Sequence, residues 1–433
     1  MTKSRLKFSK SFFLLFPQLF FLPFLFLFLF LFLFCGCTSY SSKFSSTADL
    51  YSAKKYSEAL SSLEDLSILK ADRNRLLYLL EKATILDEIP DYSKSRSTFI
   101  EADKLADKLY TQSLTKNIAS FLYNDTTTDY SGEDYEKITI HTMLALSFLK
   151  ERNIGSALIE ARKINNKLYE IISGYNHTSY KEDAFARFLS GLIYEAKSEY
   201  DNAIIDYKKA LTLYESGYFK VVTPSYLVES LYTLLKARSR QSDITALIKK
   251  YPYLKQLSSS PSEASIVTIR KSGLISKKVS RSFSFGVGDQ IVSFSYPVIV
   301  DVSASRNQER SIIINGTIFT KEQLVQDMNL IARDTLEEKR LRLIAKTSSR
   351  AVLRAGMSHE LKKNGSDVAL LANLVLQISS IFTEQADTRS WNLCPSSFYI
   401  SRTKVKPGKY NLRFINQNVD INLEPKQIYF LVE

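Results

Sequence analysis

The sequence predicts an α+β protein in two parts, a helical N-terminal half and a mixed α+β C-terminal half with a β region at its end. Residues 48–257 place apolar side chains three and four positions apart and contain few glycines, as amphipathic helices do. Beyond residue 265, apolar residues alternate with polar ones or are β-branched, which favours strands. The small, polar stretch "SSSPSEAS" lies between the two patterns. We therefore expect a helical domain at 48–257, a linker at 258–265 and an α+β domain at 266–433.

The N-terminal segment has the features of an export signal. Several basic residues and no acidic ones occupy the first ten positions, and an apolar run then extends from Phe12 to Phe34. The run ends in "FCGC", which resembles the lipobox of bacterial lipoproteins. The resemblance implies a signal peptide at 1–36, cleavage before Cys37, acylation of that cysteine with palmitate-type chains, and a polar tether at 37–47. A cleaved signal of this kind competes with an uncleaved anchor, because about two dozen apolar residues can span a bilayer.

The residue after the candidate lipidation site favours one membrane. Thr38 stands where Asp would indicate retention in the inner membrane, so the resemblance implies a lipid-anchored protein on the periplasmic face of the outer membrane. The alternative is a signal-anchored protein of the inner membrane. If Cys35 is removed with the signal peptide and Cys37 is acylated, Cys394 is the one thiol that remains. A single thiol cannot form a disulfide within its own chain. We expect Cys394 to be a buried small hydrophobe.

The helical half contains one strong repeat unit, residues 183–215. Small residues there let two antiparallel helices approach closely, and tyrosines fill the gaps beside them: Gly191, Tyr194, Tyr200, Ala203, Tyr207 and Ala210. This pattern resembles the tetratricopeptide repeat (TPR), and weaker copies lie around residues 83–102 and 145–161. Three or more such hairpins stack into a solenoid with a continuous core. The resemblance implies that the concave face binds a peptide or a partner helix. The alternative is that these helices only brace the next domain.

The C-terminal half alternates between strand and helix patterns. Strands are predicted in "SIVTIRKSG", "QIVSFSYPVIVDVSAS" and "RSIIINGTIFT". A long helix is predicted at residues 321–361, with Leu324 and Met328 on its apolar stripe, and a second, almost wholly apolar helix at 367–382. Four further strand patterns follow, from "SSFYISRTKV" to "IYFLVE", with a turn at "KPGK".

Three blocks in order along the chain suggest a family. They are "YSGEDYEKITIHTMLALSFL", "EDAFARFLSGLIYEAKSEYDNAIIDYKKA" and "EQADTRSWNLCPSSFYISRTKVKPGKYNL". Together they resemble an uncharacterised family of bacterial TPR-containing outer-membrane lipoproteins. The resemblance implies exported, lipid-anchored proteins and no particular activity.

Two clusters could carry chemistry or recognition. Asp387, Arg389 and Trp391 could form a recognition site, but we favour a buried ion pair that closes a turn beside the core, with the tryptophan packed against it. We accordingly expect Arg389→Ala to destabilise only the C-terminal domain. The adjacent acids Glu133, Asp134 and Glu136 could supply the paired carboxyls of a glycan hydrolase. Acids just before a helix more often complement its N-terminal charge.

No other residue pattern indicates catalysis. His141, His177 and His359 lack metal-ligand spacing, so we expect no metal and no cofactor. The formal net charge of +13 is dispersed along the chain, which does not indicate nucleic-acid binding. The sequence therefore predicts a lipid-anchored periplasmic scaffold or adaptor that binds protein partners in cell-envelope assembly or maintenance, with no catalytic residues. The alternative is a cell-wall-acting hydrolase.

Overall fold

The computed structural model describes residues 40–89, 92–115, 128–173, 180, 182–217, 220–257, 262–287, 290–300, 309–340 and 386–433. The predicted signal peptide, Cys37, His177, His359, the predicted helix at 367–382 and the second half of the predicted helix at 321–361 lie outside these ranges. No helix within them is long and apolar enough to cross a membrane.

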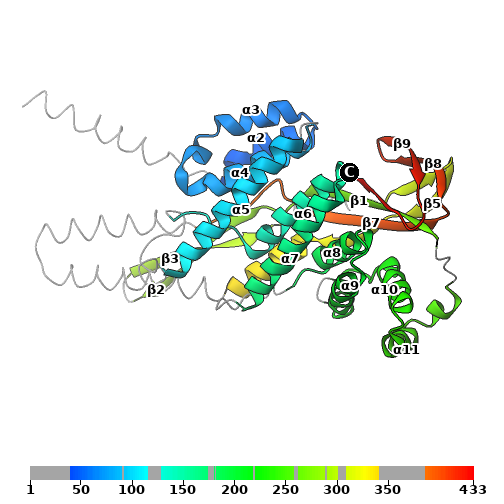
Figure 1. Ribbon diagram of the computed structural model, residues 1–433. Coiled ribbons are helices and arrows are strands. Elements are labelled where there is room, and N and C mark those ends of the chain that lie inside the picture. Colours follow the sequence, from blue (N-terminus) through cyan, green and yellow to red (C-terminus); the bar gives the residue numbers. More distant parts are fainter. Residues whose placement is uncertain are drawn as a thin grey trace, which may run out of the picture.

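The N-terminal half is an array of helical hairpins, shown in blue to green in Figure 1. Its α-helices are α2 (Tyr40–Ser52), α3 (Tyr56–Asp65), α4 (Arg75–Asp87), α5 (Tyr92–Thr115), α6 (Asp134–Lys150), α7 (Ile154–Ser173), α8 (Ala184–Ala196), α9 (Tyr200–Glu215), α10 (Ser225–Ala237) and α11 (Gln241–Lys250). Short 3-10 turns lie at Ser67–Lys70, Asp72–Asn74 and Pro252–Gln256. Each even-numbered helix packs against the next odd-numbered one, and successive hairpins also contact each other. The predicted mixed α+β class is confirmed.

The predicted tether at 37–47 is wrong where the structure describes it. Residues 40–47 are helical and form the first part of α2. Tyr40 and Phe44, four residues apart, are 4% and 1% exposed. The serines and threonines between them suggested a flexible segment, but side chains four apart share one face of a helix, and here that face packs into the core.

The hairpin α8–α9 is held together by a close contact of one glycine with one tyrosine. A Cβ atom on Gly191 would lie 2.4 Å from the ring of Tyr207, which is nearer than any real contact. Tyr207 is fully buried and donates a hydrogen bond of 2.6 Å to Glu195 Oε2. Ala203 and Ala210 are fully buried, Tyr194 is buried and Tyr200 is half-buried.

We expect Gly191→Ala to destabilise the protein by about 1–3 kcal/mol, because the added methyl group overpacks this contact. Gly155→Ala is the matched control. It also lies in a helix, but its added Cβ would meet only Asn153 Oδ1, at 3.7 Å, so we expect no loss of stability. Urea unfolding followed by circular dichroism measures both, and equal midpoints for the two variants would contradict the close-packed hairpin.

The described residues of the C-terminal half form two four-stranded sheets and a separate hairpin. The first sheet has the order β10-β1-β7-β6, and β6 (Gln323–Asp327) is one of its edges. Strand β1 (Ala264–Leu274) pairs in parallel with β10 (Ile428–Val432) and antiparallel with β7 (Pro395–Val405). The second sheet, β5-β4-β8-β9, is antiparallel, with β5 (Thr317–Lys321), β4 (Ser311–Ile314), β8 (Gly408–Phe414) and β9 (Gln417–Leu423). Strands β2 (Lys278–Val287) and β3 (Gln290–Ile299) form the hairpin. The four predicted C-terminal strands are confirmed.

Two predicted boundaries need correction. Strand β1 begins at Ala264, so the last two residues of the predicted linker belong to the sheet. The predicted helix at 321–361 does not begin at 321, because β6 (Gln323–Asp327) pairs with the edge of β7 and places Leu324 opposite Tyr399. Helix follows from residue 328. The Asp327 side chain accepts the amides of Asn329 and Leu330 at 3.0 and 3.3 Å, and this N-terminal cap separates strand from helix.

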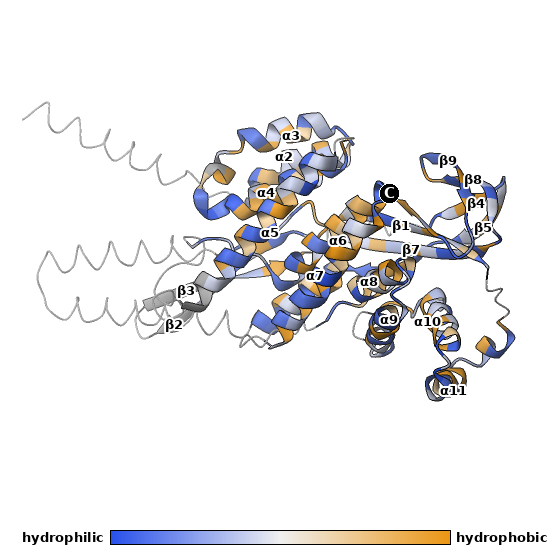
Figure 2. Cartoon of the chain, in the orientation of Figure 1, coloured by the Kyte–Doolittle hydropathy of each residue, from blue (hydrophilic) through white to orange (hydrophobic). Residues whose placement is uncertain are grey.

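One hydrophobic core joins the two halves. Side chains from the helices pack with Val267 and Ile269 of β1, with Trp391, and with Phe398 and Ile400 of β7. A smaller core lies between the two sheets. Figure 2 shows hydrophobic residues along much of α6, which is buried over most of its length. The first sheet therefore lies between the helical array and the second sheet.

Candidate functional site

The even-numbered helices hold one extended segment of the C-terminal half. We call their sheet-facing side the inner face of the array. Residues 386–405, which lead into and form β7, contact α4, α6, α8 and α10 in turn. The Phe185 ring of α8 stacks on Phe398 with 4.8 Å between ring centroids, and the Tyr226 hydroxyl of α10 donates to the Ile400 carbonyl at 2.5 Å. Figure 1 shows β1 and β7 passing beside α6 and α8.

Two buried carboxylates bind the main chain of this segment. Glu81 of α4 accepts the amides of Asn392 and Leu393, at 2.7 and 2.9 Å. Glu136 of α6 accepts the amide of Trp391 at 2.9 Å. Three consecutive amides are therefore bound by two helices. A buried amide left without an acceptor costs about 1–3 kcal/mol, so these contacts fix the path of the segment.

The Trp391 side chain lies deep between α4 and α5. It is fully buried, and its indole Nε1–H donates to Thr84 Oγ1 at 2.9 Å. Its ring packs on Phe99 of α5 with 5.8 Å between centroids. The tryptophan thus fixes the segment to the second hairpin through both its ring and its N–H group.

Arg389 links the segment to the helical half. Its Nε donates to Asp387 Oδ1 at 2.9 Å and its Nη2 to Oδ2 at 2.7 Å. Its Nη1 donates to Asn74 Oδ1 at 3.1 Å and to the Thr128 carbonyl at 2.9 Å. The Arg389 side chain is 6% exposed and that of Asp387 25%. Because two of these partners belong to the helical half, the expectation that Arg389→Ala affects only the C-terminal domain has to be replaced.

Burial raises the pKa of three groups at this site, Glu81, Glu136 and Cys394. It raises the pKa of Glu81 to about 8, and the amides of Leu393 and Asn392 offset this only in part. Burial likewise raises the pKa of Glu136, and it raises the pKa of the Cys394 thiol, which is fully buried. The Tyr40 hydroxyl donates to Glu81 Oε1 at 3.3 Å, which also offsets part of the effect of burial.

We expect stability to fall as pH rises from about 4.5 to about 8. Glu81 has a native pKa near 8 against an ordinary value of 4.5, so the native state holds a proton that the unfolded state has released in this window. One such group contributes a slope of up to about 1.4 kcal/mol per pH unit. Unfolding free energies measured at pH 5, 6.5 and 8 test this. Glu81→Gln should flatten the slope, whereas Glu64→Gln, an exposed carboxyl 3.0 Å from Lys82, should not.

The predicted acidic cluster is engaged in structural contacts. Glu133 and Glu136 form a capping box at the start of α6. Glu133 also forms ion pairs of 2.6 and 2.7 Å with Lys278 and Lys339, which outweigh burial and hold its pKa well below the usual range. Asp134 lies 3.2 Å from Lys137. These carboxylates therefore bind helix amides and lysines.

His141 is also held between helices. Its Nδ1 lies 2.9 Å from Glu160 and its Nε2 3.2 Å from Asp103. Burial alone would lower the pKa of His141, but these two hydrogen bonds outweigh it and raise the pKa. Among the residues that the structure describes, no group of three or more His, Cys, Asp or Glu side chains could hold a metal ion.

Sequence reasoning missed Glu81 and Thr84, which hold the segment from α4. A signal for them exists in "RLLYLLEKATILD", where an acid and a hydroxyl interrupt an apolar run three residues apart and therefore share one helix face. A buried charge in such a run needs a hydrogen-bonding partner. The partner could not be identified, because it is a stretch of main chain about 300 residues away.

Comparison with known proteins gives little further information. No protein-family model matches the sequence, and no curated protein matches it. Among solved structures, MamA of AMB-1 is 15% identical, covers 50% of this chain and 92% of its own, with a TM-score of 0.30. A putative kinesin light chain of Podosopora anserina with nearly identical TPR-like repeats is 12% identical over 49% of this chain and 93% of its own (TM-score 0.29). BtubC from P. vanneervenii is 16% identical over 50% and 79% (TM-score 0.29). Similarity at this level transfers no function.

Proposed function

We propose that this protein is a lipid-anchored, non-enzymatic scaffold of the bacterial cell envelope that binds a protein partner on the odd-numbered helices of its array, which we call the outer helices. The family that the sequence resembles supports this, as does the "FCGC" motif before Cys37. The observation that carries the proposal is that residues 386–405 of the same chain already cover the inner face of the array. Glu81 and Glu136 bind main-chain amides, which is how a protein receives an extended peptide, but here the peptide is part of the same chain.

The outer helices offer a different surface to a partner. Ile159 of α7 and Ile205 of α9 are 54% and 52% exposed. Each lies two residues after a fully buried alanine, Ala157 or Ala203, so they occupy equivalent positions in consecutive hairpins. Tyr169 of α7 is 71% exposed. Exposed apolar side chains at equivalent positions of stacked hairpins offer an apolar surface that a partner can cover.

In-cell cross-linking followed by affinity purification tests the scaffold. The wild-type chain should yield a cross-linked protein partner whose contact site maps to α7 and α9. Ile159→Asp combined with Ile205→Asp should remove this product without changing the melting temperature. Ser97→Asp, at the equivalent exposed position of α5, is the matched control and should leave the product intact. Unchanged cross-links in the double variant would contradict the proposal.

The membrane anchor is tested at Cys37. Two residues separate Cys37 from the first residue of α2, so an acylated Cys37 would hold the array within about 10 Å of the bilayer surface. More than one acyl chain is needed for stable attachment. We expect mass spectrometry of the native protein to find an acylated N-terminal Cys37, and Cys37→Ser to accumulate as precursor. A native protein that still begins at Met1 would indicate the inner-membrane signal anchor instead.

A further inference from the structure

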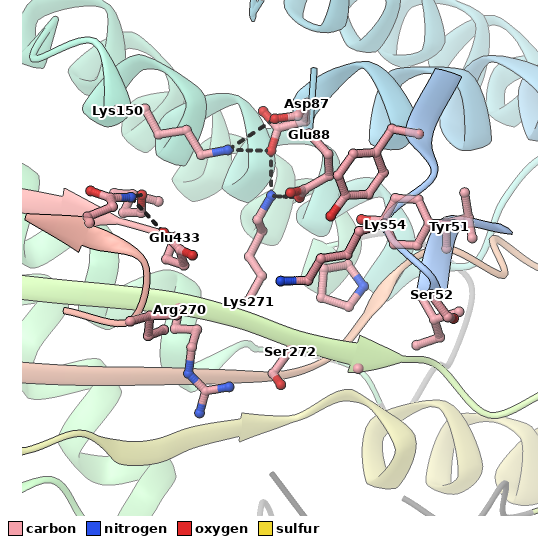
Figure 3. A pocket seen from close by; sticks show the side chains of 18 of the residues that line it. Tyr51, Ser52, Lys54, Asp87, Glu88, Lys150, Arg270, Lys271, Ser272 and Glu433 are labelled. Atoms are coloured by element: carbon pink, nitrogen blue, oxygen red, sulfur yellow. Dashed lines mark hydrogen bonds and ion pairs between the residues drawn. The ribbon is translucent and has the colours of Figure 1, made fainter. Parts of the chain in front are cut away.

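The two sheets of the C-terminal half differ in what covers their faces. The first sheet is attached to the helices by ion pairs as well as by the core. Figure 3 shows Lys271 of β1 and Lys150 of α6 meeting Asp87 at the end of α4, and the Lys150 ammonium lies 2.9 Å from Asp87 Oδ2. The second sheet buries one face in the smaller core between the sheets. We call its other face the open sheet face.

Strand register defines the residues of the open sheet face. Residues that are paired directly across neighbouring strands point to the same side of a sheet. Ile318 of β5 pairs with Ile313 of β4, which pairs with Arg413 of β8. These pairings, with the alternation of side chains along each strand, give ten members of the face: Ser311, Ile313, Ile318, Lys321, Lys409, Asn411, Arg413, Asn418, Asp420 and Asn422. None of these ten residues is buried, whereas Ile312 and Leu412, which alternate with them, lie in the smaller core.

The open sheet face carries an excess of positive charge. Lys321, Lys409 and Arg413 are exposed, and none of the three forms an ion pair with another residue that the structure describes. The face has one acidic residue, Asp420, whose carboxylate accepts a hydrogen bond of 2.8 Å from Asn411 Nδ2. Three cations and one carboxylate leave this face positive, so it attracts an anionic partner.

A β-bulge adds apolar side chains at the edge of the face. The pairing of β4 with β5 shifts between Ile312 and Ile313, because β5 contains one extra residue, Phe319, at this point. A bulge changes the direction in which the side chains of its strand point. Two consecutive residues of β5 are therefore exposed, Ile318 by 65% and Phe319 by 54%. The cations thus lie beside an exposed apolar edge.

The spacing of the cations indicates an extended partner. Lys409 and Arg413 are four residues apart on β8, which corresponds to about 13 Å, and Lys321 lies two strands away, about 10 Å in the hydrogen-bonding direction. Groups at these separations cannot converge on one small anion. A second copy of this chain would place the same positive charges opposite and be repelled. A plane of many anions fits this arrangement.

We propose that the open sheet face docks the protein onto a bilayer surface that contains anionic phospholipids. The three cations meet headgroup phosphates, and Ile318 and Phe319 enter the boundary between headgroups and acyl chains. Binding at this boundary combines buried apolar side chains with attraction to anionic lipid. The apolar edge favours a bilayer over a soluble acidic polymer, which has no apolar layer to receive it. The proposal rests neither on the scaffold function nor on the lipid anchor.

Co-sedimentation with vesicles tests the proposal. The chain used begins at Thr38, so it retains every described residue and lacks both the apolar run and the candidate acylation site. We expect it to bind vesicles of phosphatidylcholine with about one third phosphatidylglycerol at about 0.1 M salt, and pure phosphatidylcholine at least tenfold more weakly. Salt at about 1 M should release it, because the Debye length falls from about 10 Å to about 3 Å.

Variants of the open sheet face locate the binding. Lys409→Gln combined with Arg413→Gln should weaken binding about thirtyfold, the loss typical of two basic residues at an anionic surface. Lys104→Gln combined with Lys108→Gln is the matched control. It removes the same charge from two exposed residues four positions apart on α5, which Figure 1 shows well separated from β5, β8 and β9, and it should bind as the wild type does.

The apolar edge is tested separately. Ile318→Ser should weaken binding about tenfold, because an isoleucine that enters the bilayer boundary is removed from water. Ile205→Ser on α9, a similarly exposed residue at 52%, should bind as the wild type does. All these substitutions are at exposed positions, so the melting temperature of every variant should equal that of the wild type.

Four results would overturn the proposal. The first is no binding to the anionic vesicles at about 0.1 M salt. The second is equal weakening by the two double variants, which would assign the attraction to net charge and not to this face. The third is full binding by Ile318→Ser. The fourth is binding of hyaluronate, a soluble acidic polymer, as tightly as the vesicles, which would make the face a site for acidic polymers.

Discussion

Trp391→Ala should lower the free energy of unfolding of the whole chain by about 3–5 kcal/mol, the usual cost of deleting a large buried aromatic side chain. The ring of Trp391 is fully buried against Phe99, and its N–H is bonded to Thr84. Removing the ring leaves a cavity between α4 and α5 and takes the hydrogen-bond donor from a buried hydroxyl. Because one core joins the helices and β7, the loss should appear in both halves at once.

Guanidinium unfolding followed by far-ultraviolet circular dichroism measures this loss, since Trp391 is the sole tryptophan and cannot report on its own removal. Tyr169→Ala is the control: that side chain is 71% exposed, and its loss should change stability by less than about 0.5 kcal/mol. If the Trp391→Ala variant is as stable as the control, residues 386–405 do not pack tightly against the helical array, and the prediction is wrong.

Arg389→Ala should destabilise the protein by about 3–5 kcal/mol, the cost of removing one partner from a buried, hydrogen-bonded ion pair. The variant leaves the Asp387 carboxylate without its guanidinium, and it leaves Asn74 Oδ1 and the Thr128 carbonyl without the Nη1 donor. Since two of these partners lie in the helical half, backbone amides in both halves should become less protected from hydrogen exchange.

Hydrogen exchange distinguishes this outcome from a local one. We expect faster exchange of amides in α4 and in β7 for Arg389→Ala, and no change for Arg75→Ala. Arg75 is the matched control because its pair with Glu101, at 2.7 Å, is about half exposed on both sides and contributes less than about 1 kcal/mol. Unaltered exchange in α4 would restore the sequence-based expectation of a purely C-terminal effect. Full stability with loss of a bound partner would make the segment a recognition site.

The local pattern of apolar and polar residues predicted those helices and strands that are stabilised by contacts between residues close in sequence. The hairpin α8–α9 was predictable because Gly191 and Tyr207 lie 16 positions apart on adjacent helices, where periodicity of 3.6 residues fixes which side chains meet. The strands β8 and β9 were predictable for a similar reason: alternation of apolar and polar residues is itself the signal of a half-buried strand.

Elements with a short or mixed pattern were decided by packing. Residues 40–47 contain many serines, yet burial of Tyr40 and Phe44 makes them helical. Residues 323–327 are apolar enough for a helix, but the free edge of β7 binds them as β6. In both cases the local preference is weak, and the contact that outweighs it comes from a distant part of the chain.

The sequence by itself determined the α+β class, the hairpin at residues 183–215 and the presence of an Asp–Arg–Trp cluster. Only the tertiary structure decided that the inner face of the array is occupied by residues 386–405. The contacts responsible join Glu81 to the amides of Asn392 and Leu393, more than 300 positions away in sequence. A main-chain amide is the same at every position, so it leaves no signature in the sequence. Its partner is chosen only when folding brings the carboxylate to it.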